Sequence, residues 1–221
     1  SGPSSRSRQT LAVRADAHAL RDPQAIARDL SAENAAVGPD KFCSPLPPGH
    51  RRRIFFNIVK GPHGEEQPFG LGYEETDAAG APVPGTFRDV VSFNPDIPTI
   101  CVPLGPGGAP VHETWELVNI AGEDHNFHLH QVKFSLATKD AISGDIVPAD
   151  GVLHDNVPLR HADPTGCHSV AKWRRGKCLA HPVLIDVPFA IAGDYVYHCH
   201  ILEHEDGGMM AVIRVRRAEG G

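Results

Sequence analysis

Residues 194–204 read Asp-Tyr-Val-Tyr-His-Cys-His-Ile-Leu-Glu-His, and the first five of them have the texture of a β-strand. Seven more strand-like runs lie along the chain: Ile54–Val59, Asp89–Phe93, Thr99–Val102, Glu113–Ile120, Asn126–Phe134, Val183–Val187 and Met210–Val215. Clusters of Gly, Pro and Asp separate them, as turns separate short strands. With 22 Gly and 20 Pro in 221 residues, the chain is predicted to be all-β, a sandwich or barrel with a substantial core.

We expect one β-sandwich over residues 50–217. Residues 1–49 differ in texture and are expected to form an extension or interdomain linker. Asp22-Pro23 suits the cap and first turn of a short helix that ends near Leu30, because proline is tolerated where a helical N–H has no partner.

Composition excludes some classes of function. The net charge of −6 argues against nucleic acid as a partner, since phosphate binding needs a basic surface. No apolar run approaches the roughly 20 residues of a membrane span. The short basic clusters Arg51–Arg53 and Arg174–Arg175 are expected to be solvated loop faces.

Histidine is clustered in two places. One cluster is His125-Asn126-Phe127-His128-Leu129-His130, and the other begins with His198-Cys199-His200 and continues to His204 and Met209. Strand side chains alternate between two faces. One face is therefore expected to collect four imidazoles, from His128, His130, His198 and His200. The opposite face would collect Cys199 and His125, joined by His204 and Met209 from the turn beyond.

The second set is the ligand list of a blue-copper site, in which two imidazoles, a thiolate and a weak axial thioether hold copper. The four imidazoles suit copper that binds and reduces dioxygen. Because Cys199 lies between His198 and His200, the chain itself connects the two sets. A structural zinc site is the alternative for a His/Cys cluster, but it leaves Met209 and the full ligand spacing unexplained.

These motifs resemble the C-terminal part of the multicopper oxidases, the family of laccases and bilirubin oxidases, most closely in residues 113–134 and 194–213. The resemblance implies a cupredoxin-like Greek-key β-sandwich. It implies that His125, Cys199 and His204 hold a type 1 copper with Met209 as axial neighbour. His128 corresponds to a type 2 ligand, and ligands of the type 3 pair correspond to His130, His198 and His200. Glu205 resembles the acidic residue that relays protons to oxygen in several bacterial members.

The sequence departs from the family pattern at two positions beside the ligands. Family members usually have Pro where Asn126 stands and often have Gly where Gln131 stands. Neither residue is a ligand, so we expect a changed loop shape and unchanged chemistry.

Half of the family's trinuclear ligands have no counterpart here. In the family that cluster uses eight histidines, four of them from two His-x-His pairs near the N-terminus. The eight histidines outside the two clusters of this chain contain no such pair. We therefore expect a partner, either an N-terminal multicopper oxidase fragment or a separate subunit, to supply both pairs.

The resemblance implies a laccase-like oxidase that takes electrons from small reductants, phenolic by default, and reduces dioxygen to water. Ferrous or manganous ions remain alternatives as reductants. A different class of function is a mononuclear blue-copper electron carrier, which would not need the four imidazoles.

Cysteine placement bears on the compartment. Cys167 and Cys178 bracket a polar segment and are expected to form a disulfide, whereas Cys43 and Cys101 could pair with each other or with a partner chain. Disulfides imply an oxidising compartment, so we expect a periplasmic or extracellular protein.

Overall fold

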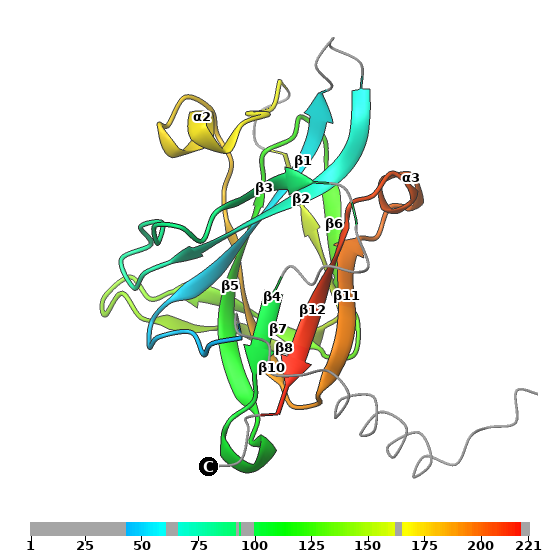
Figure 1. Ribbon diagram of the computed structural model, residues 1–221. Coiled ribbons are helices and arrows are strands. Elements are labelled where there is room, and N and C mark those ends of the chain that lie inside the picture. The colour runs from blue at the N-terminus through cyan, green and yellow to red at the C-terminus, as the bar shows by residue number, and fades with distance from the viewer. Residues whose placement is uncertain (1–42, 61–65, 92, 94–99, 162–164, 218–221) are drawn as a thin grey trace, which may run out of the picture. The chain divides into compact units, whose positions relative to one another are not determined.

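Most of the strand-like runs form strands in the computed structural model, which describes residues 43–60, 66–91, 93, 100–161 and 165–217 (Figure 1). The predicted helix ending near Leu30 lies outside these residues, as does most of the predicted extension. Three strands had no counterpart among the runs, namely β2 (Glu66–Thr76), β8 (Ile146–His154) and β9 (Asn156–Leu159).

The larger sheet has seven strands in the order β3-β2-β1-β5-β10-β7-β8. Besides β2 and β8 it contains β1 (Arg51–Lys60), β3 (Arg88–Val91), β5 (Val111–Asn119), β7 (Phe134–Lys139) and β10 (Val183–Phe189). Its neighbouring strands are antiparallel except β1 and β5, which are parallel.

The smaller sheet has five strands in the order β4-β12-β11-β6-β9. Besides β9 it contains β4 (Ile100–Pro103), β6 (His125–Leu129), β11 (Gly193–Cys199) and β12 (Met210–Arg216). The pair β4–β12 is parallel and the others are antiparallel. In this sheet β6 and β11, the strands that carry the histidine clusters, are neighbours.

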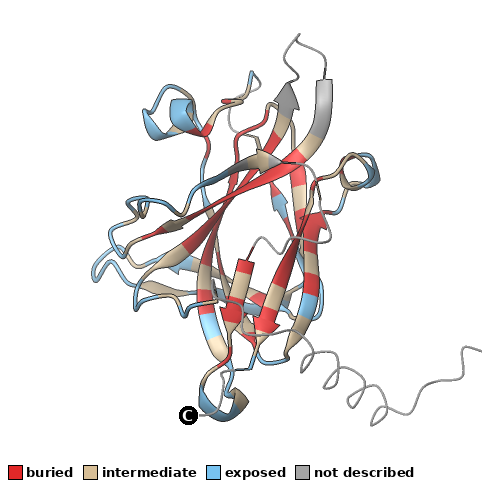
Figure 2. Ribbon diagram, in the orientation of Figure 1, coloured by how far each residue is buried: buried red, intermediate tan, exposed pale blue. Residues whose placement is uncertain are grey.

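A single large core joins the two sheets. Trp115 and Ile185 from the larger sheet and Phe127, Tyr197 and Ile213 from the smaller one are fully buried in the same cluster. Figure 2 shows the buried residues following the strands, with exposed residues gathered in the connections. The prediction of an all-β, cupredoxin-like sandwich is confirmed.

The run Asn126–Phe134 is not one strand, as the sequence suggested, but two. β6 ends at Leu129 and β7 begins at Phe134. Between them Gln131 has a φ of 71°, in the left-handed region that side chains other than glycine adopt rarely. Glycine would adopt this φ without strain, and the turn moves the chain from the smaller sheet to the larger one.

The prediction of a solvated Arg51–Arg53 cluster was wrong. All three residues belong to β1, and Arg52 and Arg53 are buried. Arg53 donates to Glu116 at 2.6 Å and to Glu74 at 2.7 Å. Burial of these charges is tolerated because each guanidinium has carboxylate partners on a neighbouring strand.

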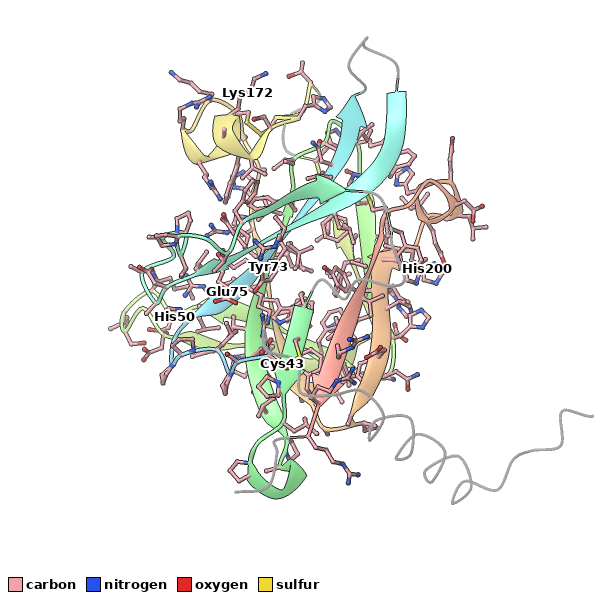
Figure 3. All side chains as sticks on the ribbon, in the orientation of Figure 1. Cys43, His50, Tyr73, Glu75, Lys172 and His200 are labelled. Atoms are coloured by element: carbon pink, nitrogen blue, oxygen red, sulfur yellow. A yellow bond between two sulfur atoms is a disulfide. The ribbon has the colours of Figure 1, made fainter. Side chains whose placement is uncertain are left out.

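Arg52 is the centre of a second buried polar network. Its Nε and Nη2 donate to the two carboxylate oxygens of Glu113, at 2.6 and 2.8 Å, and its Nη1 donates to the Tyr73 hydroxyl at 2.8 Å. Tyr73 donates in turn to Glu75, and the two side chains lie close together in Figure 3. Burial alone would lower the pKa of Arg52, but the charge of Glu113 raises it above its ordinary value.

Two disulfides fix connections around the sandwich. The predicted Cys167–Cys178 bond is present and closes a short loop over a sequence separation of 11. Cys43 pairs with Cys101 in β4, so the segment just before β1 is tied to the smaller sheet across a separation of 58 (Figure 3). In the chain-entropy model the first bond stabilises by about 3 kcal/mol and the second by about 4 kcal/mol, since longer loops lose more entropy in the unfolded chain.

The helices of the described residues are short connections, namely η1 (Pro106–Gly108), α2 (Val170–Arg174) and α3 (Leu202–Asp206). None of them has the length and apolar character needed to cross a membrane. Only α3 lies at the histidine clusters.

Candidate metal centre

The pairing of β6 with β11 sets the positions of the clustered side chains. His198 lies opposite His128, and Cys199 lies opposite Phe127. Because side chains alternate along both strands, Cys199 joins Phe127 on the core face while His198 and His128 share the other face. His125, three residues before His128, is buried on the core side.

Three donor atoms meet on the core side of the smaller sheet. The Sγ atom of Cys199 lies 3.7 Å from Nδ1 of His125 and 3.5 Å from Nδ1 of His204, and the two Nδ1 atoms are 3.0 Å apart. All three residues are buried. They come from three segments: the start of β6, the end of β11 and helix α3.

The turn after β11 folds back on the thiol. The Met209 backbone N–H donates to the carbonyl of His204, and the Cys199 N–H donates to the carbonyl of Met209. These two bonds close the loop that contains α3 and bring His204 to the sulfur. The Met209 side chain is fully buried in the same core cluster as Cys199.

This triangle fits a metal ion. A point at its centre lies about 2 Å from each donor atom, close to the length of bonds that imidazole nitrogen and thiolate sulfur make to metal ions. His125 also turns its Nδ1, not its Nε2, toward the thiol, and its buried Nε2 has no hydrogen-bond partner among the described residues. Two imidazoles and one thiolate in a plane are the donor set that copper uses in electron-transfer sites.

Burial keeps these imidazoles neutral. It lowers the pKa of His125 to about 3, and the nearby His204 acts in the same direction. It also lowers the pKa of His204, against the charges of Glu123 and Glu203. Neutral imidazole is the form that binds metal ions, so both side chains are ready for ligation near neutral pH.

Burial has the opposite effect on the thiol. It raises the pKa of Cys199, while hydrogen bonds from the backbone N–H groups of Asn126 and Ile201 act to lower it. The Asn126 nitrogen lies 3.4 Å from the sulfur. A bound metal ion would remove the thiol proton outright.

Four imidazoles gather on the other face of the same two strands. The ring centre of His128 lies 4.9 Å from that of His130, 5.2 Å from that of His198 and 5.0 Å from that of His200. Nε2 of His130 and Nε2 of His198 are 3.1 Å apart. His128, His130 and His198 can place their ligand atoms within 4.8 Å of one another, while His200 stands at the exposed edge (Figure 3).

Hydrogen bonds orient two of these rings. Nδ1 of His128 donates to the carbonyl of Asp155 at 2.7 Å, which leaves its Nε2 available to a metal. Nδ1 of His198 donates to the carbonyl of Cys199 and lies 3.3 Å from a carboxylate oxygen of Glu205. Glu205 therefore contacts His198 of the four-imidazole group, although it directly follows the thiol-site residue His204 in sequence.

Three residues near the thiol site were not found by sequence reasoning. Phe69 stacks on the ring of His204 with centres 4.2 Å apart, and the Glu123 carboxylate lies 3.3 Å from Nε2 of His204. Asp124 accepts hydrogen bonds from the backbone of His161, from Arg160 and from the ring of His161, and these bonds hold its pKa near 2. Glu123 and Asp124 could have been found from the sequence, because they form an acidic pair directly before His125. Phe69 could not, because β2 was not predicted.

His112, just before the buried part of β5, pairs with Asp186 of β10 and is largely exposed, so it has no contact with either ligand group.

Comparison with known proteins identifies the family to which this chain belongs. The sequence model of the multicopper oxidases matches residues 84–219, which include every residue of both ligand groups. The chain belongs to the multicopper oxidase family. Copper is therefore the metal that the family implies for these side chains, and the enzymes of the family are oxidoreductases.

Several multicopper oxidases and laccases are similar to this chain. A multicopper oxidase of Staphylococcus aureus is 33% identical over 109 residues, which are 48% of this chain and 20% of that protein. A laccase of Bacillus stratosphericus is 34% identical over 102 residues, covering 44% and 19%. The chain thus matches about a fifth of the length of these relatives. A solved multicopper oxidase of Campylobacter jejuni, described as a metallo-oxidase, aligns with a TM-score of 0.46 at 21% identity over 81% of this chain and 31% of that one.

Proposed function

We propose that this multicopper oxidase chain forms the type 1 copper site and half of the trinuclear copper site of a laccase-like enzyme. One observation carries the proposal. The two ligand groups lie on opposite faces of β6 and β11, and Cys199 of one group is bonded through the backbone to His198 and His200 of the other. A protein with a single metal site has no use for this arrangement.

The type 1 ligands would be His125, Cys199 and His204, with Met209 in the axial position. The donor distances of 3.0 to 3.7 Å support the three equatorial ligands. The complete burial of Met209 in the same core cluster as Cys199 supports an apolar axial neighbour. All of these residues belong to this chain, so this site would be complete without a partner.

The trinuclear site would take His128 as a type 2 ligand and His130, His198 and His200 as type 3 ligands. Among these imidazoles His200 is exposed and His128 is half-buried, whereas His198 is buried. A partner, either an N-terminal fragment or a separate subunit, would cover the imidazole face and supply two His-x-His pairs. The small share of relatives' length that the chain matches supports such a missing part.

Copper bound in these sites would supply one-electron oxidation of a small reductant, phenolic by default, and reduction of dioxygen to water. Cys199 would provide the covalent path for each electron, since one peptide link joins it to His198 and another joins it to His200. Glu205, at 3.3 Å from His198, would hold a proton beside the imidazole face and deliver it toward oxygen. The two disulfides support export to the periplasm or the extracellular space.

The proposal is tested by copper content with optical and electron paramagnetic resonance spectra of the isolated protein. About four coppers per chain, with an intense thiolate-to-copper band and a type 2 signal, are expected when the partner is present. A single copper with the blue band alone would favour the electron carrier. Tetrahedral zinc and no blue band would contradict both.

Glu123 should affect which reductants the enzyme prefers. Its carboxylate lies 3.3 Å from Nε2 of His204 and its side chain is 42% exposed, so a reductant approaching this side of the site meets a negative charge. We expect Glu123→Gln to raise KM for a cationic reductant by up to about fivefold, the effect of roughly 1 kcal/mol in an exposed charge pair. KM for a neutral phenol should change little.

Steady-state kinetics with the two reductants measure this difference, and Asp206→Asn, a charge change farther along α3, is the control. Equal changes in KM for both reductants would show that Glu123 does not act through its charge.

A further inference from the structure

The backbone N–H of Asn126 is directed at the sulfur of Cys199. Its nitrogen lies 3.4 Å from Sγ, within hydrogen-bond range for sulfur, and the sulfur is fully buried. The family pattern that this chain resembles has proline at this position, and proline has no N–H to donate. The departure from the family pattern therefore adds a hydrogen bond to the atom that binds the proposed type 1 copper.

The sheet does not use this N–H for pairing. Asn126 lies opposite Pro158 of β9, and its carbonyl accepts from the N–H of His200 at 2.6 Å on the β11 side. On an antiparallel strand the N–H and the carbonyl of one residue point to the same side. The Asn126 N–H therefore points toward the end of β11, where it meets the side chain of Cys199.

Hydrogen bonds to a ligating sulfur change the redox potential of the metal. The negative charge on the sulfur is greater when copper is reduced, because the cuprous ion withdraws less of it than the cupric ion. A donor fixed beside the sulfur in a buried site therefore stabilises the reduced state more than the oxidised one.

We propose that the Asn126 backbone N–H is a specificity-determining group that raises the reduction potential of the type 1 site. The inference rests on the proposed function. A higher potential lets the site take an electron from weaker reductants, since each reductant loses one electron and the site gains it. No bond forms or breaks at Asn126. The N–H of Ile201 also acts on this sulfur, so the proline of relatives would leave one donor where this chain has two.

The test compares Asn126→Pro with Asn126→Ala in the copper-loaded protein. Alanine removes the side chain and keeps the N–H, whereas proline removes the N–H as well. The midpoint potential is measured by redox titration of the blue band. We expect proline to lower the equilibrium constant for reduction by about threefold to tenfold, or roughly 30 to 60 mV at 59 mV per tenfold change for one electron. Alanine should stay within about twofold of the native protein. Equal midpoints for the two variants would overturn the inference.

A second measurement needs no variant. In the native protein loaded with a spin-active cadmium isotope, a bond from N–H to the ligating sulfur should give scalar coupling between the metal and the Asn126 amide proton. A cross-peak at that amide supports the inference, and its absence while other ligand couplings are seen contradicts it. Failure of the native protein to form a blue copper site would instead count against the proposed function itself.

Discussion

Replacing Cys199 by serine should abolish the blue absorption band and lower oxidase activity by more than 100-fold. The band requires charge transfer from a thiolate to copper, and a serine hydroxyl is neither a soft ligand nor ionised at neutral pH. Loss of an orienting neighbour of a metal ligand costs 10- to 100-fold, so loss of the ligand that also links the two sites should cost more. The absorption spectrum and oxygen consumption of the assembled protein measure both effects.

The double variant Cys167→Ser/Cys178→Ser is the matched control, because it changes two cysteines that form a disulfide instead of facing the histidines. It should keep the band and lose only stability. An intense blue band that survived in the Cys199 variant would refute the assignment of the thiolate ligand.

Arg52→Met should destabilise the fold by about 3–5 kcal/mol, the usual cost of removing one partner from a buried ion pair. Arg52 and Glu113 are both almost completely buried, and the variant would leave the Glu113 carboxylate without its cation. In a domain of this size the change corresponds to a fall in melting temperature of roughly 6–20 °C. Thermal unfolding followed by circular dichroism measures it.

Adding Glu113→Gln to Arg52→Met should recover part of the loss. The second change removes the unpaired charge and keeps an oxygen that can accept from Trp115 Nε1, which donates to Glu113 at 3.0 Å. Arg214→Met, at a more exposed pair with Asp194, is the comparison and should cost about 1 kcal/mol or less. If the single Arg52 variant were as stable as the Arg214 variant, the buried network would contribute little.

The core strands and the two-faced ligand pattern could be predicted because both follow from the alternation of side chains along a strand. Two of the three missed strands lack this signal, and the third, β9, alternates exposed and buried residues over only four positions. β2 contains Gly70 and Gly72, and its pairing with β1, not its own propensity, makes it a strand. β8 contains Pro148 and Gly151, and none of its residues is buried, so no apolar alternation marks it.

Other features depend on contacts that are distant in sequence. From the local sequence Arg52 and Arg53 are expected at the surface. They are buried because the parallel strand β5, distant in sequence, supplies the carboxylates of Glu113 and Glu116. The pairing of Cys43 with Cys101 was left open because disulfide connectivity cannot be deduced from spacing alone. The sequence likewise could not show that Asn126 directs its N–H at the sulfur, since a backbone group has no residue type to mark it.

The two ligand groups on β6 and β11 also restrict how the length of this chain can vary. Because side chains repeat every two residues, one residue inserted between His125 and His128 would turn one of them to the wrong face of the sheet. Substitutions at intervening positions leave that count unchanged. The exposed turn from Asp140 to Asp145 carries no such restriction and can accept added residues. We therefore expect related sequences to differ by insertions in the turns, but only by substitutions within β6 and β11.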